Sequence, residues 1–322
     1  MATRTPNKIA LIGLGSIGIS FAALHIQHTD AHLSVYDPRP DLQAHLESIL
    51  PLYLGEVSKV ATTTVADLLS NGRLRLASSV EDACAGAHIV QEQGPENLEF
   101  KRRALRAIEA SAPPEAHLWS STSGIPVSAQ AANMKDRARL LVVHPFNPPH
   151  ILPLIEISPG PETAPERVRF AKTFFETLGS GHCPVVVRKE VPGFVGNRLA
   201  FALLREAVSL VNEGVVDDVS DIDTVVEASL GPRWAVQGPF KSYAMGGGTG
   251  GLGAFLKNLA GSIQTVWDDQ SRQLPNILDK DGKPADWVDT LVAKTDAVYG
   301  LPTPVVIEDR DVKLRRLLEA RK

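Results

Sequence analysis

Residues 8–25 read KIALIGLGSIGISFAALH, in which an apolar run is followed by three spaced glycines and then by a helical apolar pattern. The spacing G-x-G-x-x-G between a strand and a helix is typical of a dinucleotide-binding turn. Gly13 would permit the tight turn, Gly15 would let the backbone approach a pyrophosphate, and Gly18 would let the helix pack closely on the strand. This unit therefore predicts a doubly wound α/β domain.

The following strand, HLSVYD at 32–37, ends in a carboxylate about 20 residues after the glycines, which completes the fingerprint. Asp37 would accept hydrogen bonds from both ribose hydroxyls and repel a 2′-phosphate, so the sequence favours NAD over NADP. Arg39 would weaken that preference. We expect backbone N–H groups around Ser16 and Ile17 to bind the pyrophosphate at the positive end of the helix. FAD and S-adenosylmethionine proteins share parts of this pattern.

The first half of the chain alternates short β-rich runs with amphipathic stretches, and long helical segments follow residue 191. We predict a Rossmann-type doubly wound, mostly parallel sheet over 1–190 and a smaller all-helical C-terminal domain over 191–322. The glycine run at 245–251 is predicted to be a loop or a lid. Predicted strands are 9–12, 33–36, 88–91, 118–120, 140–143, 154–157 and 184–187; predicted helices are 17–27, 42–50, 96–110, 165–178, 194–213, 221–230, 252–268 and 287–298.

Composition narrows the class of partner. A formal net charge of -4 and a pI near 6.2 give no reason to expect nucleic acid or an anionic membrane, so a small molecule is the expected partner. Cys84 and Cys183 are the only cysteines, and no spacing suits zinc, so we expect neither a disulfide framework nor a metal. The start MATRTPNK lacks the apolar core of a signal peptide, and we expect a cytoplasmic protein.

A histidine and a glutamate face each other across a predicted turn. Residues 142–157 read VVHPFNPPHILPLIEI, and a reversal around Pro148 and His150 sets His144 opposite Glu156. A histidine is the natural base for an alcohol dehydrogenase, and a carboxylate on its other ring nitrogen fixes the tautomer. His144 also ends a parallel-type strand, where open α/β sheets bind ligands. We expect the remaining histidines to be structural or on the surface, with His25 and His182 in polar or helical surface positions.

Two further polar groups are predicted near this pair. Ser123 in SSTSG follows the strand HLWS, so it should lie at the same sheet edge as His144. Asn197 in VPGFVGNRLAF lies in the first turns of the next helix. Either residue alone is more often a cap than part of a site, and it is their joint placement that favours a site.

The motifs IGLGSIG with Asp37, GPENLEFK, SSTSG, HPFNPP followed by PLIEI, and VPGFVGNRL occur in this order and resemble the 3-hydroxyacyl-CoA dehydrogenase superfamily. The resemblance implies a helical second domain that forms a homodimer. It also assigns roles within the motifs: a general base (His144), its orienting partner (Glu156), groups that bind the substrate oxygen (Ser123 and Asn197), a supporting amide (Asn147), and groups near the nicotinamide ribose (Glu96 and Lys101).

The substrate is predicted from two weaker signals. HPFNPPHILPLIEISPGPET resembles the L-gulonate 3-dehydrogenase and lambda-crystallin branch, whereas GPRWAVQGPF with GGGTGG resembles the L-carnitine dehydrogenase branch. Balanced charges over 38–80 make a poor cradle for CoA phosphates, so we expect a free L-3-hydroxy acid, L-gulonate first, with Arg233 as its carboxylate anchor. Trp234 and Tyr243 would suit a quaternary ammonium group, although two aromatic residues at that spacing are more often core residues. An L-3-hydroxyacyl-CoA substrate and a non-catalytic, crystallin-like NAD-binding protein are the alternatives.

Overall fold

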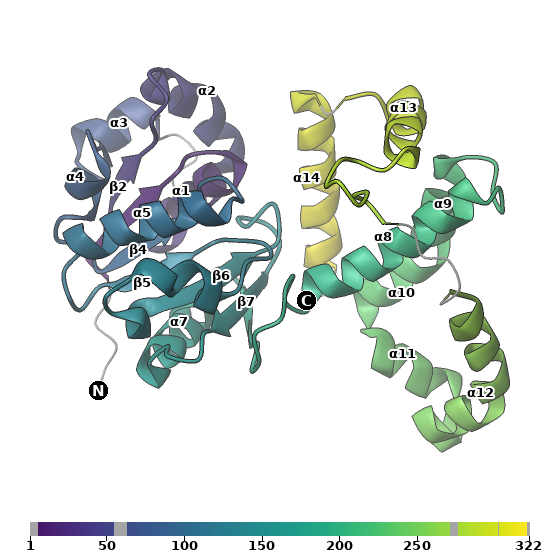
Figure 1. Cartoon of the computed structure of the whole chain (residues 1–322). Helices are drawn as coiled ribbons and strands as arrows, with labels where there is room; N and C mark the ends of the chain where they lie inside the picture. Colours follow the sequence, from purple (N-terminus) through teal and green to yellow (C-terminus); the bar gives the residue numbers. More distant parts are fainter. Residues whose placement is uncertain (1–5, 55–62, 271–275, 302, 321–322) are drawn as a thin grey trace. The chain divides into compact units, whose positions relative to one another are not determined.

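The computed structural model describes residues 6–54, 63–270, 276–301 and 303–320, and the chain forms two compact units, Met1–Arg198 and Leu199–Lys322 (Figure 1). The division falls within the first turn of α8 (Gly196–Asn212). The boundary predicted at residue 190 lies in the loop before this helix and stays a prediction.

The first unit is built on one eight-stranded sheet of order β3-β2-β1-β4-β5-β6-β7-β8. All neighbours pair in parallel except β6 and β7, which are antiparallel. This confirms the predicted doubly wound, mostly parallel sheet, although β3 was missed because so short a run carries no pattern. The strands are β1 (Lys8–Ile12), β2 (His32–Tyr36), β3 (Leu74–Leu76), β4 (Ile89–Glu92), β5 (His117–Ser120), β6 (Leu140–Pro145), β7 (Leu154–Pro159) and β8 (Cys183–Val186).

Helices cover both faces of the sheet, and alternate strand residues supply the two cores. In β1, Ile9 and Leu11 pack on one face, and Ala10 and Ile12 pack on the other. Figure 1 shows α5 in front of the sheet. The first core is completed by α1 (Ser16–His28), α2 (Leu42–Leu54), α3 (Val65–Ser70) and α7 (Pro165–Thr177), and the second by α4 (Val80–Cys84), α5 (Leu98–Ser111) and α6 (Val127–Gln130).

The surface position expected for His25 is wrong. This side chain has no exposed area, and its ring lies 6.0 Å from each of the rings of Phe21 and Phe174. Its Nε2 is 3.4 Å from Oε1 of Gln91, and burial lowers its pKa to about 4. α1 is covered nearly all round, so a histidine within its apolar run lies inside. His182 is buried as well, at 8% exposure.

The described residues of the second unit form helices and no strand, as predicted, apart from one isolated β-bridge between Leu278 and Pro284. α9 runs through a π-helical turn, Val226–Leu230, directly into α10, so the predicted helix 221–230 is longer than expected. The glycine run is a tight turn between α11 and α12, where a Cβ on Gly247 would lie 1.8 Å from the oxygen of Gly251. The helices after α8 are α9 (Val219–Val225), α10 (Gly231–Val236), α11 (Pro239–Gly246), α12 (Gly251–Gln270), α13 (Trp287–Tyr299) and α14 (Pro304–Glu319). None of the described helices is long and apolar enough to span a bilayer.

Candidate active site

The glycine turn after β1 has the shape that a dinucleotide needs. Gly13 has φ +97°, and a Cβ on Gly18 would lie 2.0 Å from the oxygen of Gly13. A Cβ on Gly15 would meet nothing within 4 Å, so the turn faces open space at this residue. No side chain caps the start of α1, where Ser16 and Ile17 lie. Free N–H groups at a helix N-terminus bind anions, so these residues fit a pyrophosphate.

Asp37 is fixed beside this turn at the end of β2. Its Oδ2 accepts a hydrogen bond from Leu14 N at 2.7 Å, and its Oδ1 accepts one from Arg39 N at 3.0 Å. The Arg39 Nε lies 3.4 Å from the same Oδ1. The carboxylate therefore stands where the adenosine ribose is bound in this type of fold, and Arg39 is paired with it.

His144 and Glu156 are paired as the sequence predicted. They are opposite each other in the antiparallel register of β6 and β7, and His144 Nδ1 lies 2.8 Å from Glu156 Oε2. Both are buried, at 4% and 1% exposure. The pair holds one ring nitrogen and leaves Nε2 for another partner, which is the arrangement of a general base with its orienting carboxylate.

The carboxylate is also held by the backbone at the start of α8. Its Oε1 accepts hydrogen bonds from Val195 N and Gly196 N, both at 2.9 Å. Burial alone would raise the pKa of Glu156, but the hydrogen bonds from His144 and these two N–H groups outweigh it and hold the pKa below its usual value. Glu156 is thus a carboxylate throughout the neutral range.

Two aromatic rings enclose the histidine. The rings of Phe146 and Phe194 lie 5.3 Å and 5.4 Å from that of His144. Phe194 is buried and has φ 51°, a left-handed conformation that non-glycine residues rarely adopt. Its backbone turn precedes the two N–H groups that bind Glu156. Strained residues of this kind often lie at functional sites.

Ser123 and Asn197 meet at this end of the sheet. Asn197 Nδ2 donates to the carbonyl oxygen of Ser123 at 2.8 Å, and Gly193 N donates to the carbonyl of Gly124 at 3.2 Å. Asn197 directly follows the N–H groups that hold Glu156, and the Ser123 side chain is exposed. Asn147 lies exposed just after β6. These residues all belong to the first unit, so their grouping is internal to it.

Two family models cover most of the chain: "3-hydroxyacyl-CoA dehydrogenase, NAD binding domain" matches residues 8–191, and "3-hydroxyacyl-CoA dehydrogenase, C-terminal domain" matches residues 193–282. The chain belongs to the 3-hydroxyacyl-CoA dehydrogenase family. It is therefore an NAD-dependent oxidoreductase that acts on CH–OH groups. NAD fits the open glycine turn and the carboxylate of Asp37.

Curated members of the family differ in their substrates. This chain is 34% identical to L-carnitine dehydrogenase of Streptomyces coelicolor, over 97% of this chain and 94% of that protein. It is 33% identical to a 3-hydroxyacyl-CoA dehydrogenase of Gibberella moniliformis, over 99% and 96%. Among solved structures it resembles 5-formyl-3-hydroxy-2-methylpyridine 4-carboxylic acid 5-dehydrogenase, described as an NAD+-dependent dismutase, with TM-score 0.74 and 32% identity over 98% of this chain and 99% of that one.

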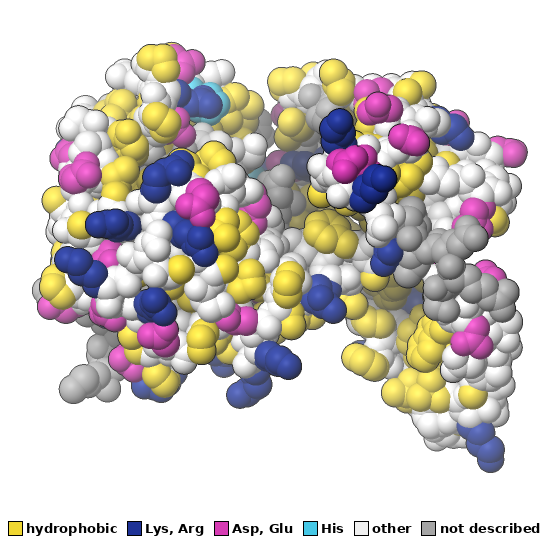
Figure 2. Space-filling view, in the orientation of Figure 1, with side chains coloured by type: hydrophobic (Ala, Val, Ile, Leu, Met, Phe, Trp, Pro, Cys, Tyr) yellow, Lys and Arg dark blue, Asp and Glu magenta, His cyan; other side chains and the backbone are white. Residues whose placement is uncertain are grey.

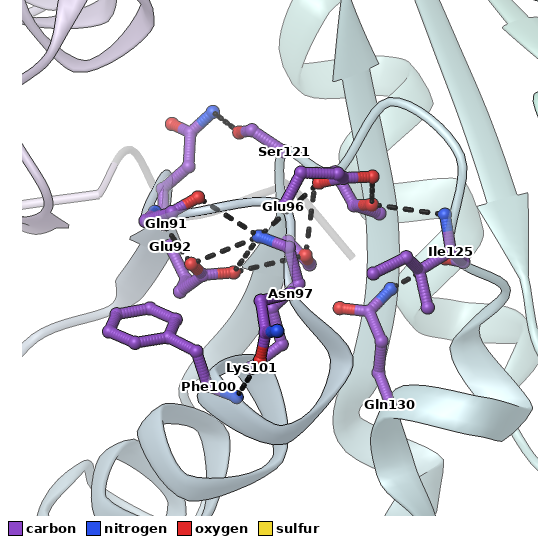
Figure 3. Close-up of polar contacts among 12 residues, drawn as sticks. Gln91, Glu92, Glu96, Asn97, Phe100, Lys101, Ser121, Ile125 and Gln130 are labelled. Atoms are coloured by element: carbon purple, nitrogen blue, oxygen red, sulfur yellow. Dashed lines mark hydrogen bonds and ion pairs between the residues drawn. The ribbon is translucent and has the colours of Figure 1, made fainter. Parts of the chain in front are cut away.

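Sequence reasoning missed one buried carboxylate, Glu92, at the same edge of the sheet. Glu92 ends β4 fully buried, and Lys101 Nζ lies 3.1 Å and 3.0 Å from its two oxygens (Figure 3). Burial raises the pKa of Glu92, against the pull of the lysine. Lys101 is 1% exposed, and its expected contact with the nicotinamide ribose stays a prediction, as does that of Glu96. The available signal was a carboxylate at the end of a strand.

The other predicted groups of this dehydrogenase lie elsewhere. Arg233 is exposed on α10, in the second unit, and its role as a substrate anchor stays a prediction. Trp234 and Tyr243 are 38% and 41% exposed, so neither is a core residue within one chain. Burial raises the pKa of the Cys84 thiol to about 12. Across the described residues, no three His, Cys, Asp or Glu side chains are grouped to hold a metal ion.

Proposed function

We propose that this dehydrogenase oxidises the 3-hydroxyl of a small free L-3-hydroxy acid to a ketone. The observation that carries the proposal is the buried His144–Glu156 pair at the carboxyl end of a parallel sheet whose first turn fits NAD. NAD, when bound, supplies the acceptor for the hydride that leaves the substrate carbon.

The residues of the chain would manage the proton. Nε2 of His144 would accept the hydroxyl proton as the oxygen forms its double bond to carbon, and the ionised Glu156 would stabilise the resulting imidazolium. Ser123 and Asn197 would bind the substrate oxygen, and Asn147 would support the site. The rings of Phe146 and Phe194 would keep water from the base, since His144 is already 4% exposed.

Residues 38–80 are the stretch that would meet CoA phosphates, and three arginines in it make hydrogen bonds or ion pairs within the protein. Arg73 donates to the carbonyls of residues 26, 29 and 31, and Arg75 is paired with Asp82 at 2.8 Å. Arg39 is paired with Asp37. Figure 2 shows basic and acidic side chains interspersed over the visible face of the first unit. A phosphate cradle needs basic side chains whose N–H donors are not already used, so this supports a free acid over a thioester.

L-Carnitine is the first acid to test. Relatives that are 33–36% identical over most of this chain carry the name L-carnitine dehydrogenase. Trp234 and Tyr243 leave enough ring area exposed to face a quaternary ammonium group, and Arg233 would bind the carboxylate. L-Gulonate, the first choice from the sequence, becomes the second. The Gibberella relative keeps an acyl-CoA substrate as the alternative.

We also propose that the second unit forms a homodimer. Large apolar side chains of its helices are open to solvent in a single chain, among them Leu199 at 63%, Phe201 at 58% and Leu204 at 52% on α8. Apolar surface of this extent is typical of a protein–protein interface.

The deciding assay follows NADH formation with L-carnitine, L-gulonate, L-3-hydroxybutyrate and L-3-hydroxybutyryl-CoA side by side, with His144→Ala as the control. We expect turnover of a free acid that is lost in the variant. Turnover of the thioester alone would refute the free-acid proposal. NAD binding without turnover of any substrate would instead favour a crystallin-like structural role.

A further inference from the structure

Four consecutive hydroxyl residues, 120–123, lie at the end of β5 and in the loop after it, and three of their side chains make hydrogen bonds within the protein. Ser120 Oγ donates to Glu92 Oε2 at 3.2 Å, Ser121 Oγ accepts from Gln91 Nε2 at 3.2 Å, and Thr122 Oγ1 donates to Glu96 Oε1 at 2.5 Å. Ser123 is exposed, and its hydroxyl makes no hydrogen bond to any described residue. The arrangement keeps one hydroxyl of the four available.

Glu96 is the residue that joins this loop to the rest of the domain. Its Oε1 accepts from Gly124 N at 3.0 Å as well as from Thr122, so it spans the loop on both sides of Ser123 (Figure 3). Its Oε2 lies 3.8 Å from Lys101 Nζ. Lys101 is in turn held by the buried Glu92. The carboxylate of Glu96 is therefore fixed by a cation that cannot move to solvent.

The opposite side of the loop is tied to the start of α8. Gly193 N donates to the Gly124 carbonyl, and Asn197 Nδ2 donates to the Ser123 carbonyl. The backbone that carries Ser123 is thus held from two directions, while its hydroxyl is not. A site of this kind needs its supporting groups because small displacements at reacting atoms reduce rates strongly.

We propose that Glu96 is a positioning residue for the substrate-binding loop. Locked by Lys101 and bonded to Thr122 and Gly124, it holds residues 120–124 so that the Ser123 hydroxyl stays available to the substrate oxygen. This inference rests on the proposed function. It differs from a direct role of Glu96 at the nicotinamide ribose, because it acts through the hydroxyl of Thr122.

The test replaces Thr122 rather than Glu96, so that the carboxylate stays in place. In Thr122→Val we expect kcat to fall about tenfold or more, with KM for NAD changed by less than about twofold. Thr122→Ser keeps the hydroxyl and should restore most of kcat. Thr163→Val is the control. Thr122 Oγ1 donates to Glu96 and accepts from the N–H groups of Gly124 and Ile125. Thr163 Oγ1 also donates to one oxygen, of Leu140, and accepts from a backbone N–H, of Gly160, at the other end of β6.

Hydrogen exchange gives a readout that needs no turnover. In the peptide that contains residues 120–125, exchange at Gly124 and Ile125 should speed up in Thr122→Val and not in Thr122→Ser or Thr163→Val, because these N–H groups bond Glu96 and Thr122. Glu96→Gln, which weakens the attraction to Lys101, should speed the same exchange to a smaller degree.

Each outcome decides the inference. Wild-type-like kcat and unchanged exchange in Thr122→Val would overturn it. So would a raised KM for NAD with kcat intact, which would assign Glu96 to the cofactor. If the wild-type chain turns over no hydroxy acid, the proposed function fails. Faster exchange in Thr122→Val would then show that Glu96 holds the loop without any role in substrate binding, which also overturns the inference.

Discussion

The two units of the chain bury their apolar side chains to very different degrees. The first has a full core on each face of its sheet, and its largest side chains, such as Trp119 and Phe21, are almost completely covered. In the described part of the second unit, Val208 and Val211 are the only apolar side chains classed as buried. Large residues there remain open, among them Phe240 at 78% and Trp267 at 62%.

The difference shows which unit is complete within one chain. The first unit closes its own core and also contains the His144–Glu156 pair and the loop of the candidate site. The described helices of the second unit bury almost none of their apolar side chains, and helices with exposed apolar faces gain little stability in water. We expect a second copy to cover them. The predictions below test this division, beginning with the largest expected effect.

Replacing the base tests whether the chemistry belongs to the first unit. In His144→Ala, kcat should fall between about a hundredfold and about ten-thousandfold, because general-base catalysis is lost. NAD binding should persist, since the glycine turn is untouched, and both are measured by steady-state kinetics and calorimetry. His32→Ala, which alters an exposed ring at the start of β2, is the control. Retention of half the activity in His144→Ala would remove His144 from its role.

Replacing the buried Lys101 tests how much its ion pair with Glu92 contributes to the stability of the first unit. Lys101→Met leaves Glu92 buried and unpaired, so the free energy of unfolding should fall by about 3–5 kcal/mol. The Glu92→Gln/Lys101→Met double variant should recover part of this loss. Lys172→Met, which breaks an exposed pair with Glu176, should be nearly neutral. Urea unfolding measures all three, and equal effects of the two lysine variants would contradict the expectation.

A charge on the exposed apolar face of α8 tests whether the second unit forms the dimer. Phe201→Glu should raise the dimer dissociation constant about thirtyfold, which corresponds to about 2 kcal/mol, because an apolar residue of the proposed interface becomes an unpaired charge. Sedimentation velocity over a dilution series measures it. Leu52→Glu, at a side chain that is 57% exposed in the first unit, should leave the dimer intact. A wild-type chain that is monomeric at all concentrations would refute the proposed homodimer.

The buried histidine of α1 makes the first unit sensitive to acid. His25 has a folded pKa of about 4 against an ordinary value of 6.5, so between these values the unfolded chain binds a proton that the folded chain does not. The contribution of His25 to the free energy of unfolding is therefore complete above pH 6.5. It falls as the pH drops towards 4, by at most about 1.4 kcal/mol per pH unit.

The variant His25→Gln keeps a partner for Gln91 without titrating, so its unfolding free energy should depend less on pH within that window. Denaturant unfolding at several pH values gives the slope, with His32→Gln as the control at an exposed position. The same slope in wild type and His25→Gln would show that other groups cause the acid sensitivity.

Much of the fold and part of the site were predictable from the sequence because they depend on local geometry. The glycine turn, the carboxylate after the second strand, and the opposition of His144 and Glu156 follow from short spacings and from the two-residue period of a strand. Ser123 and Asn197 were also placed at one edge of the sheet. The short strand β3 and the burial of His25 were not, since neither has a distinctive local pattern.

The sequence by itself determined most of the strands, the NAD turn and the facing His144–Glu156 pair, because each depends on residues that are close in the chain. Only the tertiary structure decided that Glu92, Lys101, Glu96 and Thr122 form one network. Its members come from β4, the loop after β4, α5 and the loop after β5. A lysine is expected to be exposed unless a buried partner for it is known. It likewise decided that the helices described in the second unit leave most of their apolar side chains exposed, because burial depends on what surrounds a helix and not on its own pattern.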